Sequence, residues 1–345
     1  MSGVSVVICT YNGSSRLRKV MDCLLIQDVS KGFPWEVIVV DNASTDDTRE
    51  VALKAWPSQS LVSYRVISEP KLGLAFARIR GLENSAYELV GFLDDDVWVY
   101  SNWVRLASEI MASYPRVGAC GGLNEAVFDG KPPRWYKRFQ VSYGMGAQGK
   151  EGDITWDKGY VFGDGMIIRK KAWVQMREVF NGFFPRCVGR LGSRLTLGED
   201  NEICYAIRLL GWQIRYDPRL KLKPFVPQSR LKEDYLFEVQ ANYGKATVAL
   251  DPYLLAGRLK PALFSGWKRQ WVYQVFLTFG KVLFFTLVFG LLIMFANARL
   301  EAFLRMVRHT NRLRELFEKK AEYNPSMWEI RRRLRKINVS DSLLS

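Results

Sequence analysis

Short apolar runs alternate with helical patterns over the first hundred residues of the chain. The runs are rich in β-branched side chains, which predicts strands at residues 4–9, 35–40, 61–68 and 88–93. Apolar positions three or four residues apart predict helices at residues 14–27 and 73–84, and Thr45 or Asp46 is expected to cap a third helix between them. Strands that alternate with helices form βαβ units, so we expect an α/β fold with a mostly parallel sheet.

The pattern is less regular between residues 101 and 225. It predicts helices at residues 102–113, 171–179 and 199–210, strands at 116–122 and 212–216, and loops with short strands over 124–160. Prolines and glycines interrupt the pattern between residues 251 and 267. We therefore expect one domain over residues 1–250 and a basic helical region over residues 251–345.

A long apolar segment occupies residues 271–298, with Lys281 as its one formal charge. A spanning helix needs about 20 apolar residues, so one crossing of a membrane would fit. Both flanks of the segment are basic, however, and basic residues prefer the cytoplasmic side. This favours a re-entrant or interfacial segment over a simple crossing. The alternative is a buried helical hairpin that forms an oligomer contact, and residues 300–320 predict an amphipathic helix that would serve either role.

The charge of the chain is concentrated in the same region. The net charge is +15, and the residues from 256 onward contain 17 Lys or Arg against 6 Asp or Glu. Positive charge beside an apolar segment indicates an anionic membrane surface rather than a nucleic acid as partner. The five cysteines show no CxxC spacing, which argues against a zinc site and favours a reducing compartment. The first residues do not resemble a signal peptide. The predicted location is the cytoplasmic face of the cell (inner) membrane.

Polar clusters follow the predicted strands at the point where each strand ends. They are Thr10-Tyr11-Asn12, Asp41-Asn42-Ala43-Ser44, Glu69-Pro70-Lys71 and Asp94-Asp95-Asp96. In open α/β sheets, ligands bind beyond the carboxyl ends of the strands. Each cluster could be an ordinary loop, but four at successive strand ends favour a nucleotide site.

The three consecutive aspartates indicate a metal site. Adjacent carboxylates repel one another unless a cation neutralises them. Oxygen ligands select Mg²⁺ or Mn²⁺, and such ions are completed by substrate phosphates, so the expected ligand is a metal–diphosphate. An acidic turn without a metal is the alternative.

Five motifs in order resemble family 2 glycosyltransferases over roughly residues 3–220. They are residues 4–12, the loop from Asp41 to Asp46, the Gly73–Arg78 segment with Gly81, the Asp94-Asp95-Asp96 motif, and Gly198-Glu199-Asp200 before a helix. Ile79 stands where the family pattern usually has Asn. The resemblance implies a GT-A fold and an inverting transfer that depends on Mg²⁺ or Mn²⁺.

The resemblance also implies a role for each matching position. Thr10, Tyr11, Asn12 and Asp41 would hold the nucleotide, Lys71 and Arg78 would orient the donor, and Asp94 or Asp95 would contact the ribose or the sugar. Asp96, with Asp94, would bind the metal, while Gly163-Asp164-Gly165 would form part of the donor and acceptor pocket. Asp200, beside Glu199, would be the general base. Either acidic residue could instead complement the dipole of its helix.

Two departures narrow the expected activity. The one histidine, His309, lies outside the predicted domain, so the metal would be held by aspartates, diphosphate and water. The Gln-x-x-Arg-Trp signature of processive synthases is absent after Asp200, which favours transfer of a single sugar.

The predicted reaction moves one sugar from a UDP- or GDP-sugar to a hydroxyl of a lipid-linked saccharide in surface glycan synthesis. One alternative is transfer to a polyprenyl phosphate, and another is a non-catalytic membrane scaffold that binds nucleotide-sugars. A nucleotidyltransferase is less favoured, because its Gly-rich phosphate loop is missing. The C-terminal helices are a candidate homo-oligomer contact.

Overall fold

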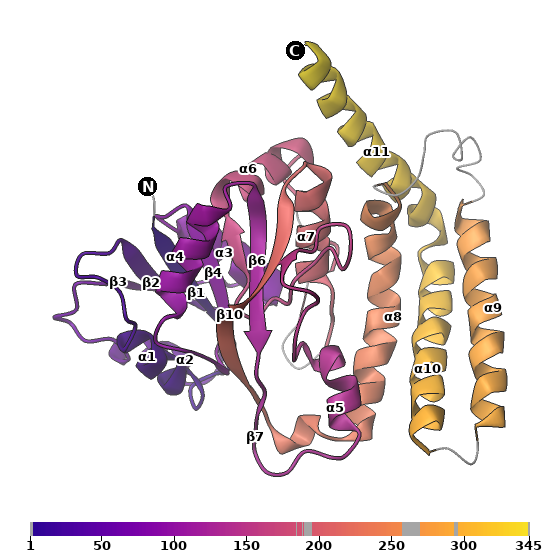
Figure 1. The fold of residues 1–345 in the computed structure, drawn as a ribbon, viewed down its shortest axis with the longest axis horizontal. Helices are drawn as coiled ribbons and strands as arrows, with labels where there is room; N and C mark the ends of the chain where they lie inside the picture. Colours follow the sequence, from indigo (N-terminus) through magenta and orange to yellow (C-terminus); the bar gives the residue numbers. More distant parts are fainter. Residues whose placement is uncertain are drawn as a thin grey trace.

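The computed structural model places a mixed sheet at one side of the molecule and a group of long helices at the other (Figure 1). It describes residues 3–183, 185–187, 189, 195–256, 270–292 and 296–343. The strands are β1 (Val4–Thr10), β2 (Trp35–Asp41), β3 (Ser63–Ser68), β4 (Leu89–Asp94), β5 (Val97–Val99), β6 (Val117–Asn124), β7 (Val127–Phe128), β8 (Gly152–Asp153), β9 (Ile167–Arg169) and β10 (Gln213–Val226). The α-helices are α1 (Leu17–Leu25), α2 (Thr48–Lys54), α3 (Leu74–Asn84), α4 (Trp103–Ser113), α5 (Tyr136–Phe139), α6 (Lys170–Val179), α7 (Glu199–Leu209), α8 (Glu233–Ala256), α9 (Gln270–Leu291), α10 (Ala296–Glu318) and α11 (Lys320–Leu343).

The predicted α/β fold is confirmed, and its first half is parallel. The sheet order is β3-β2-β1-β4-β9-β6-β10-β5, and the first four strands pair in parallel. Thr10 pairs with Asp41, and Cys9 pairs with Asp94, so the polar clusters after these strands share one edge of the sheet. Beyond β4 the sheet is mixed, because β9 and β5 run antiparallel to their neighbours.

Helices cover both faces of the sheet. Alternate side chains of β1 enter two separate cores, because successive residues of a strand point to opposite faces. Val7 packs in the core that also contains side chains of α3, α6 and α7, whereas Val6 packs in the core with α1 and α4. Helices therefore bury both faces of the sheet, and a ligand can reach the sheet at the carboxyl ends of its strands.

Strand β10 is longer than predicted. The sequence pattern predicted a strand only over residues 212–216. The structure carries the strand through this point with a register shift against β6 between Tyr216 and Lys221. An irregularity in the pairing with β6 thus accommodates Pro218 within the strand.

The C-terminal helices form a layer beside the sheet domain, with α10 between α8 and α9 (Figure 1). Helices α9 and α10 are antiparallel, since Trp271 packs on Phe317 near one end and Phe289 packs on Phe303 near the other. Helix α8 continues through residue 250, so the proposed domain boundary there falls inside a helix. The sequence predicts an interruption between residues 251 and 267, but α8 continues through Pro252 to Ala256. Residues 257–267 lie outside the described residues, and the division of the chain stays a prediction.

Helix α9 differs from a helix in a soluble core, because it buries polar side chains and exposes large apolar ones. Its two buried residues are both polar, Gln274 and Thr278. Both accept hydrogen bonds from Arg312 of α10, whose guanidinium also pairs with Asp251 of α8 at 2.7 Å. Several large apolar side chains of α9 are exposed, among them Phe276, Phe284 and Leu287. Within the described part of the chain, α9 is the one helix long and apolar enough to cross a membrane. The apolar segment predicted over residues 271–298 is not one helix, because α9 ends at Leu291 and α10 begins at Ala296.

Candidate active site

A cavity of about 650 Å³ lies at the carboxyl ends of β1 and β4, and α8 and α10 contribute to its wall. Most of the candidate residues line it: Thr10, Tyr11, Asn12, Arg78, Asp94, Asp95, Asp96, Gly163, Asp164, Glu199 and Asp200. Three candidates, Asp41, Lys71 and Gly165, are not among the lining residues. The structure therefore brings the acidic residues after β4 and those at the start of α7 into one cavity, although about 100 residues separate them in the chain.

The three candidates outside the lining have local roles in the structure. Asp41 accepts a hydrogen bond from the backbone N–H of Ser44. The Lys71 ammonium lies 4.0 Å from the centre of the Phe76 ring. Gly165 has a φ of +71°, a conformation that favours glycine, and a Cβ there would meet Leu222. Gly165 thus sets the turn that brings Asp164 to the cavity.

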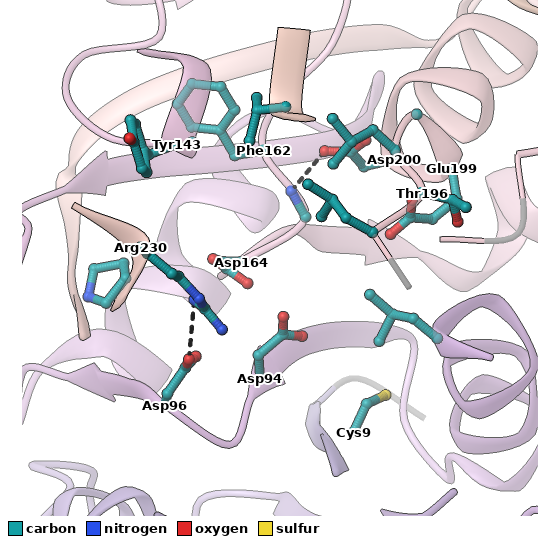
Figure 2. A pocket seen from close by; sticks show the side chains of 18 of the residues that line it. Cys9, Asp94, Asp96, Tyr143, Phe162, Asp164, Thr196, Glu199, Asp200 and Arg230 are labelled. Carbon is teal, nitrogen blue, oxygen red and sulfur yellow. Dashed lines mark hydrogen bonds and ion pairs between the residues drawn. The ribbon is translucent and has the colours of Figure 1, made fainter. Parts of the chain in front are cut away.

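The three consecutive aspartates are not equivalent. Both carboxylate oxygens of Asp95 are occupied, by the Thr10 hydroxyl at 2.7 Å and by the Arg16 guanidinium at 2.8 and 3.0 Å. Asp94 and Asp96 are the members of the trio whose carboxylates lie beside Asp164 in the cavity (Figure 2). Asp95 therefore fixes the loop, and its two neighbours are presented to a ligand.

Asp94, Asp96 and Asp164 crowd negative charge into one part of the cavity. Burial raises the pKa of Asp96 to about 6 despite Arg230, whose guanidinium lies 3.4 Å from its carboxylate. Burial, followed by the charges of Asp94 and Asp96, raises the pKa of Asp164 well above its usual range. A divalent cation would relieve this repulsion. The described residues contain no group of three or more His, Cys, Asp or Glu that could hold a metal unaided, so the donor set fits an ion completed by phosphate and water.

Arg78 connects the two acidic parts of the cavity. Its guanidinium is 3.0 Å from Glu199 and 3.4 Å from Asp94, and its side chain is 4% exposed. Burial raises the pKa of Glu199 to about 7, and the charge of Arg78 acts in the opposite direction. The ion pair with Arg78 engages Glu199 in the cavity wall, and we assign Glu199 a positioning role.

Replacing Arg78 by Met is expected to lower the free energy of unfolding by about 3–5 kcal/mol, because Glu199 would remain buried without its partner. Denaturant unfolding measures the change. The double variant Arg78→Met/Glu199→Gln removes the orphaned charge and should recover part of the loss. Strictly additive losses in the double variant would contradict a coupled pair.

Asp200 faces the cavity from the first turn of α7. One carboxylate oxygen accepts the backbone N–H of Gly163 at 3.0 Å, and the other accepts the N–H of Asn201 at 2.8 Å (Figure 2). Burial raises the pKa of Asp200, while Arg78, these two N–H groups and Lys158 act to lower it. The carboxylate is therefore held in a fixed orientation by backbone donors, as a proton acceptor requires.

Sequence reasoning missed the part of the cavity wall contributed by α8 and α10. Gln240 and Tyr243 come from α8 and Arg308 from α10, and Tyr160 lies beside them. The missed residues also include Arg16 and Arg230, which pair with Asp95 and Asp96. None belongs to a motif, and a polar residue on an amphipathic helix normally faces solvent. Only the packing of α10 on α8 shows that Arg308 reaches the cavity.

Known glycosyltransferases are similar in sequence to part of this chain. A sequence model described as Glycosyl transferase family 2 matches residues 5–175. The Glycosyltransferase AglE of Haloferax volcanii is 32% identical over 102 residues, which are 30% of this chain and 33% of that protein. The GalNAc(5)-diNAcBac-PP-undecaprenol beta-1,3-glucosyltransferase of Campylobacter jejuni is 31% identical over 96 residues, 28% of this chain and 30% of that protein. The chain thus spans about a third of the length of these curated relatives.

Some solved structures are similar to this chain over nearly its whole length, and one of them illustrates the fold. It is the mannosyltransferase PcManGT from Pyrobaculum calidifontis in complex with GDP-Man and Mn²⁺, with a TM-score of 0.54 and 16% identity. The alignment covers 99% of this chain and 88% of that one. At this identity the likeness concerns the fold alone, and it confirms the GT-A architecture expected from the sequence.

Proposed function

Because the chain contains a glycosyl transferase family 2 domain, we propose that it is an inverting glycosyltransferase that moves one sugar from a nucleotide-sugar to a hydroxyl of a lipid-linked saccharide. The single observation that carries the proposal is the shared cavity. It joins a cluster of carboxylates suited to a metal–diphosphate with Asp200, a carboxylate held by backbone N–H groups. Loss of a nucleoside diphosphate from a sugar requires the first, and proton removal from the attacking hydroxyl requires the second.

Asp94 and Asp96 would hold the metal, and their oxygen ligands suit Mg²⁺ or Mn²⁺. When bound, the ion neutralises the charge that develops on the leaving diphosphate. Arg16, Arg78 and Arg230 hold the surrounding carboxylates in place. The similar mannosyltransferase was solved with GDP-Man and Mn²⁺, which supports a divalent ion here. Asp200 accepts the proton of the acceptor hydroxyl on the side of the sugar opposite the diphosphate, and this arrangement leads to inversion.

The outward face of α9 supports attachment to a membrane. Phe276 is 70% exposed and Leu287 is 68% exposed, while the polar residues Gln274 and Thr278 are buried against α10. A crossing by α9 would carry α10 into the hydrocarbon with it, together with its arginines, and their burial there is costly. We therefore infer that α9 lies in the interface, with basic residues of the hairpin facing anionic headgroups.

A membrane-bound enzyme would meet its acceptor there. The related Campylobacter enzyme is named for a diphosphate-undecaprenol acceptor, which supports a lipid-linked saccharide as the acceptor class for this chain. The reaction would then take place at the cytoplasmic face of the cell membrane. Surface polysaccharide or glycan synthesis is the corresponding process.

The test begins with a thermal-shift screen of nucleoside diphosphates, with and without Mn²⁺. A ligand that binds only the folded state raises the midpoint, so the correct nucleotide should be recognised by a metal-dependent shift. The matching nucleotide-sugar, labelled in the sugar, is then incubated with the full chain and a membrane lipid extract. Label in the lipid phase supports the proposal. Metal-dependent binding of the nucleotide without transfer to any acceptor would support the non-catalytic scaffold instead.

Replacing Phe276 and Leu287 together by Glu is expected to lower the fraction of protein that floats with anionic liposomes by about tenfold or more. Burial of each large apolar side chain contributes roughly 1.5–3 kcal/mol, and the new carboxylates are repelled by the headgroups. Thermal stability should change little, because both side chains are exposed.

The matched control is Leu53→Glu with Leu61→Glu, which alters two exposed leucines of the sheet domain. This variant should float like the wild type. Equal flotation of the α9 variant and the wild type would exclude α9 as the membrane contact. A loss of oligomers in gel filtration would then favour the oligomer contact.

A further inference from the structure

Arg308 extends from α10 to the wall of the cavity, although α10 lies outside the sheet that carries the acidic residues after β4. Its Nε donates to the side-chain oxygen of Gln240 at 2.8 Å, and Nη2 donates to the same atom. Its guanidinium carbon lies 4.9 Å from the centre of the Tyr243 ring. One amide oxygen and one aromatic face therefore fix the guanidinium, and both come from α8.

Arg308 has no acidic partner among the residues that the structure describes. Every ion pair that involves an arginine near the cavity is made by Arg16, Arg78 or Arg230. The titratable groups that act on Arg308 are Tyr160, Tyr243 and Arg305, and none of them is a carboxylate. A guanidinium that is positioned in a cavity by neutral groups retains its full charge for a ligand, and its planar donors match phosphate well.

The contact between α8 and α10 fixes the position of this charge. At Gly244 the two helices approach so closely that a Cβ would lie 2.1 Å from the carbonyl oxygen of Arg308. The absence of a side chain at Gly244 therefore lets the backbone of α10 rest on α8 at this residue. Arg308 is thus held by the packing of the two helices as well as by its own side-chain contacts.

Arg308 lies on the Asp200 side of the cavity. Tyr160 precedes Gly163, whose backbone N–H donates to Asp200, and its ring packs edge-on against Tyr205 of α7, the helix that contains Asp200 in its first turn. The Tyr160 hydroxyl also contacts Tyr243. Tyr243 in turn stacks on Arg308. These contacts lead from the proposed base to the hairpin that contains α9, whereas the donor diphosphate is assigned to Asp94 and Asp96. The guanidinium of Arg308 is therefore in a position to bind the charged group of the acceptor.

We propose that Arg308, with Gln240 and Tyr243, binds the phosphate of a lipid-linked acceptor. The inference rests on the proposed function and adds a recognition element to it. The hairpin would perform two tasks with one pair of helices: α9 contacts the lipid surface, and α10 holds the headgroup phosphate with the saccharide directed toward Asp200. Acceptors of the same sugar without phosphate would then be bound more weakly.

Geranyl diphosphate serves as a soluble isoprenoid diphosphate probe, with geraniol as the uncharged control. Calorimetry is performed on the full chain in detergent, with the donor site first saturated by Mn²⁺ and the nucleoside diphosphate from the thermal-shift screen. The wild type should bind the probe but not geraniol. Arg308→Gln should weaken binding of the probe by about tenfold to a hundredfold, and Arg308→Lys by less, because lysine keeps the charge without the planar donors.

The control variant is Arg314→Gln, which removes the same charge from an exposed position on the same helix. Its affinity for the probe should equal that of the wild type. Affinity of Arg308→Gln for the nucleoside diphosphate should be unchanged, which separates this role from donor binding and from misfolding. The proposal is overturned if the wild type does not bind the probe, if the bound nucleotide excludes it, or if Arg308→Gln binds it equally well. Loss of nucleotide binding by the wild type would instead count against the proposed function.

Discussion

Asp200→Asn is expected to reduce kcat by about 10³-fold, within the range that general-base catalysis contributes. The carboxylate is held by the N–H groups of Gly163 and Asn201, and an amide of the same shape can keep one oxygen acceptor there. The substitution therefore removes the proton acceptor with little change in position. The KM for the donor should stay near the wild-type value, because the donor is assigned to the residues around Asp94. Initial rates over a range of donor and acceptor concentrations measure both quantities.

The pH profile tests the same assignment without a substitution. Burial raises the pKa of Asp200, and the base acts only when it is ionised. The rate should therefore fall with decreasing pH, and the fall should begin above the usual aspartate range near about 4. Glu199→Gln is the neighbouring control, since the Glu199 carboxylate is engaged in an ion pair with Arg78, and it should lower kcat less. Wild-type turnover by Asp200→Asn would favour a polyprenyl phosphate acceptor, which is ionised already and requires no base.

The core of the fold and the edge that carries the site could be predicted because both follow from local pattern. Buried strands read as apolar runs, and parallel pairing brings their ends together, as the register of Cys9 with Asp94 shows. The sequence could not distinguish the members of the aspartate trio. Asp95 differs from its neighbours only because Arg16 and Thr10 occupy its oxygens, and the sequence does not specify those distant contacts.

The C-terminal hairpin of α9 and α10 is a part of the fold that the sequence could not predict. Hydropathy identified the apolar segment, but Gln274 and Thr278 are too weak a signal to indicate that α9 folds back on a charged helix. These two residues are buried as acceptors for Arg312, which is more than 30 residues away in the chain. Arg308 was assigned only to a basic flank for the same reason. Residues that gain their role from helix packing are visible only when the packing is known.

Replacing Asp96 by Asn is expected to lower kcat/KM by about 10³-fold, because the diphosphate would lose part of its neutralising cation when the sugar leaves. Asp96 and Asp94 are the two carboxylates of the trio that remain available for a metal, since Asp95 is engaged by Arg16. Treatment of the wild type with EDTA should produce a similar or larger loss, and added Mn²⁺ should reverse it. In Asp96→Asn, the Mn²⁺ concentration needed for half-maximal rate should increase.

Metal-free stability separates this effect from damage to the fold. Asp94, Asp96 and Asp164 crowd like charges together, so the loss of one charge should leave the unfolding midpoint equal or slightly higher. Arg230, the partner of Asp96, is 27% exposed and retains contact with water after the change. Asp28→Asn, at a side chain that is 76% exposed, is the control for the loss of one carboxylate. An Asp96→Asn protein that is stable, binds Mn²⁺ as the wild type does and keeps full activity would show that the cation is held elsewhere, and the proposed role of the acidic trio would then be wrong.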